Sequence, residues 1–325
     1  MMKKAFTMAE ILLSLTIIGV VAAITLPSLT GNINERTWNT QRKALYARFS
    51  QAIALMPALN GYGTFTEGTG SNSAVDTAAE AFVTEGLSKV LKINNICDAD
   101  HLADCGIPAK LTTLTGSDFG SFPKTMVELN EMFDGSVVWS AYNSDGTDAV
   151  HRYKQGNTKA AAFETVNGES VVVYYNPACQ NDLDKKGSGG WYYSQPRICA
   201  NFIYDLNGNK GPNTVGKDIG VITALYPSDS VVVAPMPVRN SVITAQHSKA
   251  SSVCKGVDAD SRISNYEEMI SIFGNKYIFG ITTLGGGYWT SSVPDATTAF
   301  ALYMPTGHLY NERRTSSLNA VCIKR

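Results

Sequence analysis

MMKKAFTMAEILLSLTIIGVVAAITLPSL, residues 1–29, is the stretch of sequence that decides the fold. Residues 6–26 are apolar or small at every position except Glu10, and a helix of this length can span the hydrocarbon core of a bilayer. Lys3 and Lys4 precede it, which predicts that this end stays in the cytoplasm and that the rest of the chain lies outside. A carboxylate inside such a segment costs about 2.5–3.5 kcal/mol on insertion scales, so Glu10 is expected to have a partner.

Residue chemistry alone leaves two other interpretations of this segment open. A cleavable signal peptide also combines a basic start with an apolar stretch, and Ala22 or Ala23 would suit its cleavage site. A plain membrane anchor is the second interpretation. Neither accounts for Glu10, because an acidic residue near the start of the apolar stretch is unusual in a signal peptide and unnecessary in an anchor.

Residues 3–10 (KKAFTMAE), followed by an apolar helix, resemble the leader of type IV prepilins and type II secretion pseudopilins. The resemblance implies cleavage between Ala5 and Phe6, methylation of the new N-terminus, and pairing of Glu10 with the N-terminal amine of a neighbouring subunit. Glycine usually precedes the cut in this family, and the chain departs from that pattern with Ala5. The implied partners are other pilin or pseudopilin subunits, the prepilin peptidase and an assembly platform in the inner membrane.

An amphipathic helix is predicted to continue beyond the apolar segment. Its apolar face is formed by residues spaced seven, four, three and four apart, namely Trp38, Leu45, Phe49, Ala52 and Met56. Asn60-Gly61 is a helix-ending signal. The fold implied by the resemblance is therefore α+β, with a long N-terminal helix over residues 6–60 packed on an antiparallel sheet.

Composition excludes two broad classes of protein. The 325 residues carry 27 Lys and Arg against 28 Asp and Glu, a net charge of −1, which argues against nucleic-acid binding through a basic face. Apolar residues make up 44%, so the chain as a whole is not intrinsically disordered. Charged residues make up only 17% and glycines number 28, which is typical of a loop-rich, partly β protein.

Residues 61–240 are predicted to form a globular domain built on an antiparallel sheet. A short helix is expected at residues 78–91. Runs rich in valine, tyrosine and other strand-forming residues predict strands at residues 136–142, 161–166, 170–175 and 198–204. Asn167-Gly168, between the second and third of these, is a tight hairpin turn signal.

Six cysteines permit a disulfide framework if the chain is exported. The sequence does not fix their connectivity. Pairing neighbours within each proposed domain gives Cys97–Cys105, Cys179–Cys199 and Cys254–Cys322. Zinc, with His101 between the first two cysteines, is the alternative for that pair, but two cysteines and one histidine form an incomplete site.

The strongest motif outside the N-terminus is DLNGNKGPNTVGKD, residues 205–218. Its alternating Asp and Asn resemble the start of an EF-hand, but Lys210 and Gly216 occupy the positions that require Gly and Glu, so it is not one. The oxygens of Asp205, Asn207 and Asp218 are candidates to hold a hard cation such as calcium. The alternative is a rigid turn in which the Asx side chains bond to backbone amides.

Residues 241–325 are predicted to form a separate small α+β module. A helix start at residues 262–269, the run GGGYWTSS at 285–292, a strand at 299–304 and a last strand at 320–325 follow in an order that resembles C-type-lectin-like modules. The resemblance implies Cys254–Cys322 as the closing disulfide. The sugar-binding calcium motifs of true lectins are missing, because Asp295 lacks a neighbouring carboxamide, so carbohydrate binding is not predicted.

Catalysis finds no support in the sequence. The four histidines, His101, His151, His247 and His308, have no recognisable nucleophile partner or metal spacing. Nucleophile-elbow, zinc-protease and phosphate-loop motifs are absent from the sequence. The chain is therefore expected to be a non-enzymatic protein.

The predicted organisation is a leader peptide at residues 1–5, a helix at 6–60, a pilin-like domain at 61–240 and the module at 241–325. The predicted function is a structural subunit, minor or at the tip, of a type IV pilus or type II secretion pseudopilus. It would sit in the inner membrane with its C-terminal domain outside the cytoplasm, and then in an extracellular or periplasmic filament. A pilin-anchored adhesin and a secreted enzyme with an ordinary signal peptide are the alternatives.

Overall fold

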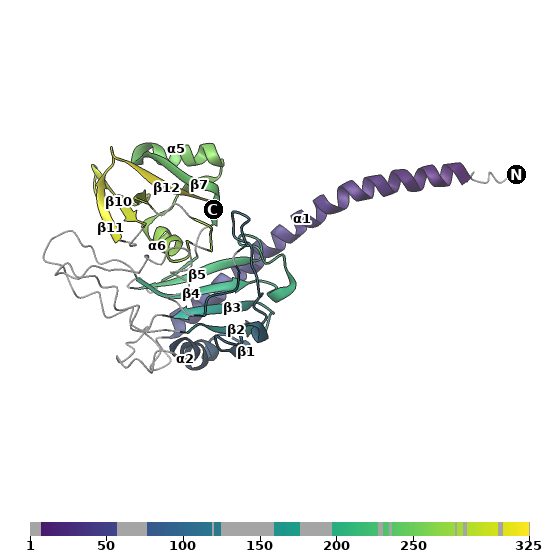
Figure 1. The fold of residues 1–325 in the computed structure, drawn as a ribbon, viewed down its shortest axis with the longest axis horizontal. Coiled ribbons are helices and arrows are strands. Elements are labelled where there is room, and N and C mark those ends of the chain that lie inside the picture. Colours follow the sequence, from purple (N-terminus) through teal and green to yellow (C-terminus); the bar gives the residue numbers. More distant parts are fainter. Residues whose placement is uncertain are drawn as a thin grey trace. The chain divides into compact units, whose positions relative to one another are not determined.

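The computed structural model describes residues 8–56, 77–118, 120–124, 159–175, 197–226, 230–233, 236–276, 278–281, 285–304 and 308–324. The chain divides into two compact units, residues 1–45 and 46–325, and each is described by itself. The described residues form helices, one antiparallel sheet and one mixed sheet (Figure 1). The predicted α+β class is confirmed at this level.

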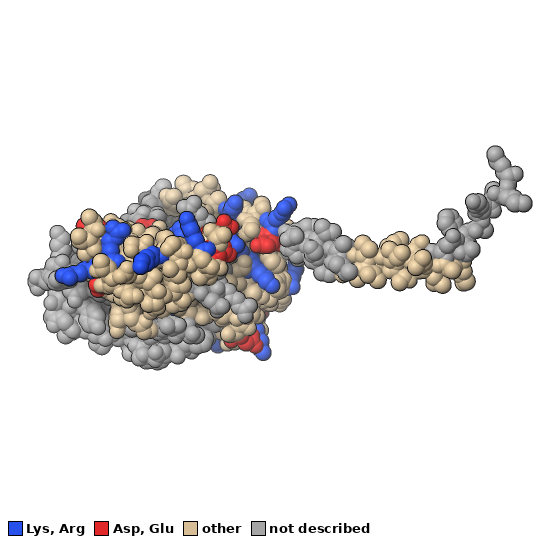
Figure 2. All heavy atoms as spheres, turned by 90° about the horizontal axis from the view of Figure 1, so that it is seen from above, with Lys and Arg blue, Asp and Glu red and all other residues tan. Residues whose placement is uncertain are grey.

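Helix α1 spans Met8–Leu55, so its first part belongs to the first unit. Large apolar side chains on this part are half-exposed or more: Ile11, Leu12, Leu13, Leu15, Ile17, Ile18, Val20 and Val21. In Figure 2 the part of the helix that carries these side chains, residues 11–21, shows no charged side chain. Among the described residues, no helix is both long and apolar enough to cross a membrane. The predicted helix limits, Phe6 and Asn60, lie outside the described residues.

In the second unit, the last turns of α1 pack on the first sheet. The fully buried Phe49 ring stacks on Phe163 at 6.1 Å between ring centroids and meets Phe202 edge-on at 5.0 Å. Ala52 and Met56, spaced to share a helix face with Phe49, are also buried. The 3.6-residue periodicity thus places an apolar face against the sheet.

The first sheet has the strand order β1-β2-β3-β4-β5-β6, and all its pairs are antiparallel. Its strands are β1 Ile93–Cys97, β2 Ala161–Thr165, β3 Ser170–Tyr175, β4 Arg197–Asp205, β5 Ile219–Tyr226 and β6 Ser230–Val233. The predicted strands at 161–166, 170–175 and 198–204 are confirmed as β2, β3 and β4, whereas 136–142 lies outside the described residues. The hairpin between β2 and β3 turns through Gly168 at φ 83°, a conformation that favours glycine.

Short helical turns flank this sheet. The predicted helix at 78–91 consists of α2 Ala78–Ala81, a π-helical turn Phe82–Gly86 and a 3₁₀ turn Leu87–Lys89. Two further 3₁₀ turns, η4 Leu102–Cys105 and η5 Gly208–Lys210, follow β1 and β4 respectively. Each of these two turns lies in a segment that carries candidate site residues.

The second sheet is mixed and has the order β11-β10-β9-β12-β7, with β8 also pairing with β12. Its elements are β7 Met236–Gln246, α5 His247–Val257, β8 Ser261–Ile263, α6 Tyr266–Gly274, β9 Gly287–Trp289, β10 Thr298–Tyr303, β11 His308–Arg313 and β12 Ser317–Lys324. Strand β12 pairs antiparallel with β7 and parallel with β9. The strands predicted at 299–304 and 320–325 correspond to β10 and β12.

Helix α6 begins within residues 262–269, where the sequence predicts a helix start. Arg262 belongs to β8, and the helix begins at Tyr266. Asn265 is its N-cap: the Asn265 carboxamide oxygen accepts from the Glu268 amide at 2.8 Å, and the Glu268 carboxylate accepts from the Asn265 amide at 2.8 Å. This reciprocal capping fixes the start of the helix.

The two sheets share one apolar core. Val172 and Ile203 of the first sheet belong to the same buried cluster as Met269 of α6 and Val321 of β12. Buried polar contacts also join the sheets: Thr223 of β5 and Ser271 of α6 lie 2.7 Å apart between their hydroxyl oxygens. Residues from both predicted domains therefore bury one another within the second unit.

Candidate functional site

The predicted processing residues lie at the edge of what the structure describes. Ala5 and Phe6 are outside the described residues, so cleavage before Phe6 stays a prediction. Glu10 lies in the first turn of α1, where the backbone is helical. Its predicted pairing with a neighbouring subunit also stays a prediction.

The motif at residues 205–218 forms the connection between β4 and β5. Asp205 is the last residue of β4, and Asp218 immediately precedes β5. The chain takes positive φ values at Gly208, Gly211 and Asn213, of 62°, 73° and 50°. Glycine and asparagine tolerate this region better than other residues, which explains why they recur in the motif.

Asp218 organises the turn through both of its carboxylate oxygens. Its Oδ2 accepts from the Asn213 amide at 2.8 Å, and its Oδ1 accepts from the Thr214 amide at 2.9 Å. The Asp218 side chain is fully buried. These contacts are those expected of a rigid turn, and they give each Asp218 carboxylate oxygen a backbone donor.

Asp205 is held differently from Asp218. Its Oδ1 accepts from the Asn207 amide at 3.1 Å, while its Oδ2 is buried and accepts no hydrogen bond from the described residues. Burial is the main cause that raises the pKa of Asp205 to about 7; the Asn207 amide hydrogen bond opposes this shift, and the nearby charge of Asp218 adds to it. The Asp205 carboxyl group therefore has a hydrogen-bond donor at only one of its two oxygens within the described residues.

Two asparagine oxygens share this property. The Asn207 amide nitrogen donates to the Gly211 carbonyl at 2.8 Å, which orients the group and leaves its Oδ1 as a buried acceptor without a donor. The Asn213 Oδ1 is likewise buried without a described donor. Asn213 is not among the ligands predicted from the sequence, although it lies within the same Asx-rich motif. Nowhere in the described part of the chain do three His, Cys, Asp or Glu side chains gather as a metal site.

The loop is braced by two other segments of the chain. The Thr112 amide donates to the Asn213 carbonyl, and the Val215 amide donates to the Thr112 carbonyl, both at 2.9 Å. On another side, a Cβ added at Gly208 would lie 3.3 Å from the Ser170 hydroxyl oxygen. These contacts fix the backbone around the unpartnered oxygens.

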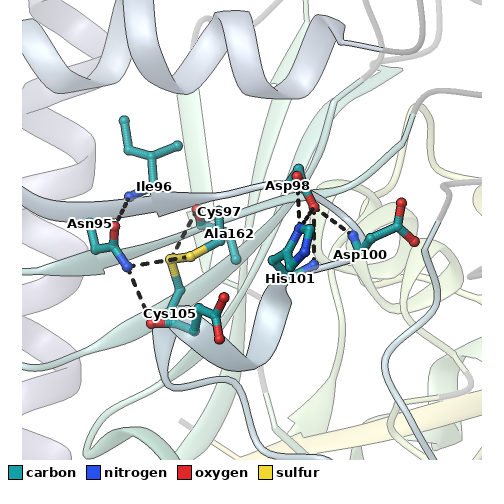
Figure 3. Close-up of a disulfide and its surroundings, with 9 residues drawn as sticks. Asn95, Ile96, Cys97, Asp98, Asp100, His101, Cys105 and Ala162 are labelled. Atoms are coloured by element: carbon teal, nitrogen blue, oxygen red, sulfur yellow. Dashed lines mark hydrogen bonds and ion pairs between the residues drawn. A yellow bond between two sulfur atoms is a disulfide. The ribbon is translucent and has the colours of Figure 1, made fainter.

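A disulfide joins Cys97 at the end of β1 to Cys105 in η4, as predicted (Figure 3). Because both sulfurs are in the bond, the alternative of zinc held by these cysteines is wrong. His101 does not approach them but donates from Nδ1 to Asp98 at 2.8 Å (Figure 3). This hydrogen bond raises the pKa of His101 and lowers that of Asp98.

The second predicted disulfide, Cys254–Cys322, is also present and links α5 to β12. Cys179 lies outside the described residues. Cys199 lies in β4, but its side chain is not among those described. The pair Cys179–Cys199 therefore stays a prediction.

The histidines are placed in different environments. His247, at the start of α5, donates from Nε2 to the Thr290 carbonyl at 3.0 Å and accepts from Arg314 Nε at 3.3 Å. Burial lowers the pKa of His247, and the Arg314 charge lowers it further. His308 is the first residue of β11, and His151 lies outside the described residues. Hydrogen bonds with Thr290 and Arg314 thus hold the His247 ring in place.

No family model matches the chain, and no curated protein matches it.

Proposed function

We propose that this chain is a pilin-like subunit, minor or at the tip, of a type IV pilus or a type II secretion pseudopilus. It is made as an inner-membrane precursor, cleaved before Phe6 by the prepilin peptidase and methylated at the new N-terminus. An assembly platform then adds it to a filament through its N-terminal helix. Its role is structural rather than catalytic.

The observation that carries the proposal is the N-terminal segment. The segment has the residue order of a prepilin leader. Two basic residues, Lys3 and Lys4, precede the small Ala5. Phe6 follows, and Glu10 is the fifth residue when Phe6 is counted as the first. The helix that follows carries large apolar side chains that the described chain leaves exposed. Such a surface is costly in water, so it requires a lipid or protein environment. In this proposal the subunit meets lipid as an inner-membrane precursor and protein once it is in the filament.

The packing of the second unit supports the pilin-like fold as part of this proposal. Phe49 lies against Phe163 of β2 and Phe202 of β4, so the end of α1 and an antiparallel sheet share a core. In this proposal the whole helix, residues 6–60, serves as the filament element. The sheet and the C-terminal module then face outward.

The test is the mature N-terminus, read by mass spectrometry of the protein from its native host. The expected species begins with N-methylated Phe6. A mature chain that begins after Ala22 or Ala23 would instead identify an ordinary signal peptide and overturn the proposal. It would also reopen the secreted-enzyme alternative.

Glu10→Val provides the second test, with Glu35→Val as the matched control on the same helix. Glu10→Val removes a charge from the apolar segment, so recovery in the membrane fraction is expected to stay the same or rise. Its share of sheared filaments should fall, because the neighbouring amine loses its partner. Glu35 is exposed and outside the apolar segment, so its variant should enter filaments normally. Equal incorporation of both variants would contradict the role of Glu10.

A pilin-anchored adhesin is the second candidate, favoured by the organisation of the predicted C-terminal module, residues 241–325. This region resembles a C-type-lectin-like module and has its own sheet and the Cys254–Cys322 disulfide. A buried cluster around Trp289 and Ala250 adds a local core. Counting copies per filament and locating them by immunogold labelling separates a shaft subunit, distributed along the filament, from a tip subunit or an adhesin. Deletion of residues 241–325 then separates the last two: only for an adhesin should filaments still assemble but lose attachment to surfaces.

A further inference from the structure

Three segments of the C-terminal part of the chain meet at the side chain of His247. This residue begins α5 and is only 8% exposed. Its Nε2 donates to the carbonyl of Thr290, directly after β9, at 3.0 Å, and its Nδ1 accepts from Nε of Arg314, in the turn between β11 and β12, at 3.3 Å. We propose that His247 and Arg314 form a pH-sensitive latch, which holds this turn and the loop between β9 and β10 against α5 at neutral pH and releases them in acid.

The two contacts fix the protonation state of the His247 ring. An arginine N–H group only donates, so Nδ1 has to be unprotonated in order to accept from Arg314. A backbone carbonyl only accepts, so Nε2 has to carry the hydrogen that it shares with Thr290. The neutral ring satisfies both partners at once. A second proton can bind only at Nδ1, which is the atom that the Arg314 N–H group already occupies.

Protonation of His247 would also bring two positive charges together. Within the described residues, no carboxylate forms an ion pair with Arg314. A charged His247 ring would therefore repel the guanidinium group from which it now accepts a hydrogen bond. Burial is the main cause that lowers the pKa of His247, the hydrogen bond to Thr290 opposes this shift, and the Arg314 charge adds to it. A proton at Nδ1 thus removes the contact between the ring and Arg314.

The other charged groups around α5 leave this role to Arg314. Helix α5 packs against β7, β8 and β12, and the His247 ring also contacts the segments that follow β9 and β11. The further titratable or charged residues on these elements are Arg239, Lys249, Lys255, Arg262, Tyr288, Asp295, Tyr310, Glu312, Arg313 and Lys324. Arg262 and Lys324 form ion pairs of their own, and the Glu312 carboxylate accepts from the Ser316 hydroxyl. Among the described side chains, the charge that shifts the pKa of the ring is that of Arg314.

Arg314 extends the contact from α5 to the loop between β9 and β10. Its amide donates to the Thr297 carbonyl at 3.0 Å, and its Nη1 donates to the Ala296 carbonyl at 3.3 Å. An Arg314 side chain that moves away from the His247 ring also gives up its bond to Ala296, so both segments lose their connection to α5. The hydrogen bond from Nε2 to Thr290 is compatible with either charge state of the ring, so the expected opening is local.

Asp295 keeps the loop itself in shape while the latch opens. Its carboxylate accepts from the Thr297 and Thr298 hydroxyls and from the amides of the same two residues. The hydroxyl donors are the main cause that holds the pKa of Asp295 well below its usual range. Asp295 therefore remains ionised at the pH at which His247 gains a proton, and the acid response comes from the histidine.

The latch is closed at high pH and opens at low pH. The pKa of His247 is lowered in the folded chain, so the closed form is complete above the usual value of 6.5 and is lost as the pH falls through the folded-state pKa. In the open form the ring is solvated and takes up a proton near its usual pKa. Each pH unit between these two values should therefore favour the open form by about tenfold.

The experiment measures amide hydrogen exchange of the full-length chain, purified in detergent with its disulfides intact, from about pH 7.5 to about pH 5. Exchange is expressed as protection factors, because the intrinsic exchange rate itself changes with pH. His247→Gln retains an acceptor and a donor but does not titrate. Arg314→Met removes the guanidinium group. Arg313→Met, at the exposed neighbouring arginine, is the matched control.

The expected result is a loss of protection that is confined to the latch. At the amides of Thr297 and Arg314, protection should fall about tenfold for each pH unit below 6.5 until the folded-state pKa is reached, while β3 keeps its protection. His247→Gln should remove most of this pH dependence. Arg314→Met should lower protection of the loop already at about pH 7.5 and reduce its change with pH, and Arg313→Met should behave like the unmutated chain.

Unchanged protection at Thr297 and Arg314 over this pH range would overturn the proposal. An equal loss in the unmutated chain and in His247→Gln would assign the response to another group, and an equal loss in β3 would show that acid destabilises the whole second unit. If His247→Gln fails to fold, Arg314→Met decides, and its equality with Arg313→Met would refute the latch. The latch does not depend on the pilin function, which is tested at the mature N-terminus, so failure of either leaves the other standing.

Discussion

Replacing Arg48 by methionine is predicted to destabilise the second unit by about 3 kcal/mol. Arg48 lies near the end of α1, and Glu169 lies in the hairpin between β2 and β3. The two groups form a two-point ion pair: Arg48 Nη2 contacts Glu169 Oε1, and Arg48 Nη1 lies 3.3 Å from Glu169 Oε2. The Glu169 side chain is only 5% exposed, and the Thr165 hydroxyl also donates to it.

The magnitude follows from the burial of the carboxylate. Removing one partner of a buried ion pair typically costs about 3–5 kcal/mol, because the other charge stays buried without compensation. The Thr165 hydrogen bond persists in the Arg48 variant, and Arg48 itself is 29% exposed, so the lower end of this range applies. Replacing both partners, as in Arg48→Met with Glu169→Leu, removes the uncompensated charge. The double variant is therefore expected to lie within about 1 kcal/mol of the unmutated chain.

Denaturant unfolding of the full chain, the two single variants and the double variant completes a double-mutant cycle. Arg36→Met serves as control, because Arg36 is an exposed arginine of the same helix and its loss should change stability by less than about 0.5 kcal/mol. A cost below about 1 kcal/mol for Arg48→Met would place the pair among weak surface ion pairs. A double variant as unstable as the single one would also refute the reasoning.

Three further predictions concern packing, covalent bonding and pH. Phe49→Ala should destabilise the second unit by about 3–5 kcal/mol in the same unfolding assay, because a fully buried ring leaves a cavity. Replacing Cys254 and Cys322 by serine should cost about 4 kcal/mol, since the bond closes a loop with a sequence separation of 68 residues, and unchanged unfolding would contradict this. Burial lowers the pKa of His247 from its usual 6.5, so its contribution to stability is complete above that value and declines as the pH falls toward the folded-state pKa. Unfolding measured from about pH 7 to pH 5 should therefore show a smaller loss for His247→Gln than for the unmutated chain.

Local structure was predictable because its causes are local. The hairpin of β2 and β3 follows from two strand-forming runs on either side of Asn167-Gly168, and the structure pairs Ala161 with Val173 accordingly. The apolar spacing of Phe49, Ala52 and Met56 likewise predicts the buried helix face. In each case the backbone preference and the hydrophobic period act within a few residues.

The candidate loop was located by sequence but its chemistry was not. The alternating Asp and Asn identified residues 205–218 and offered both a cation site and a rigid turn. Whether a side chain stabilises the turn or keeps an oxygen free for a cation depends on the hydrogen-bond donors that reach it. These donors include backbone amides that the fold brings close. Asp218 receives two such donors, whereas Asp205 and Asn213 each keep an oxygen without one.

The sequence by itself determined the prepilin-like order of the N-terminal residues, the amphipathic helix, the turn signals and the chemistry available in the Asx-rich loop. Only the tertiary structure decided the strand order, the parallel pairing of β12 with β9, the core shared by both sheets and the meeting of Arg48 with Glu169. These features join residues that are far apart in the chain. Their pairing depends on which apolar faces of the helices and sheets are buried together and which polar groups then lose contact with water. A local sequence pattern does not contain this information.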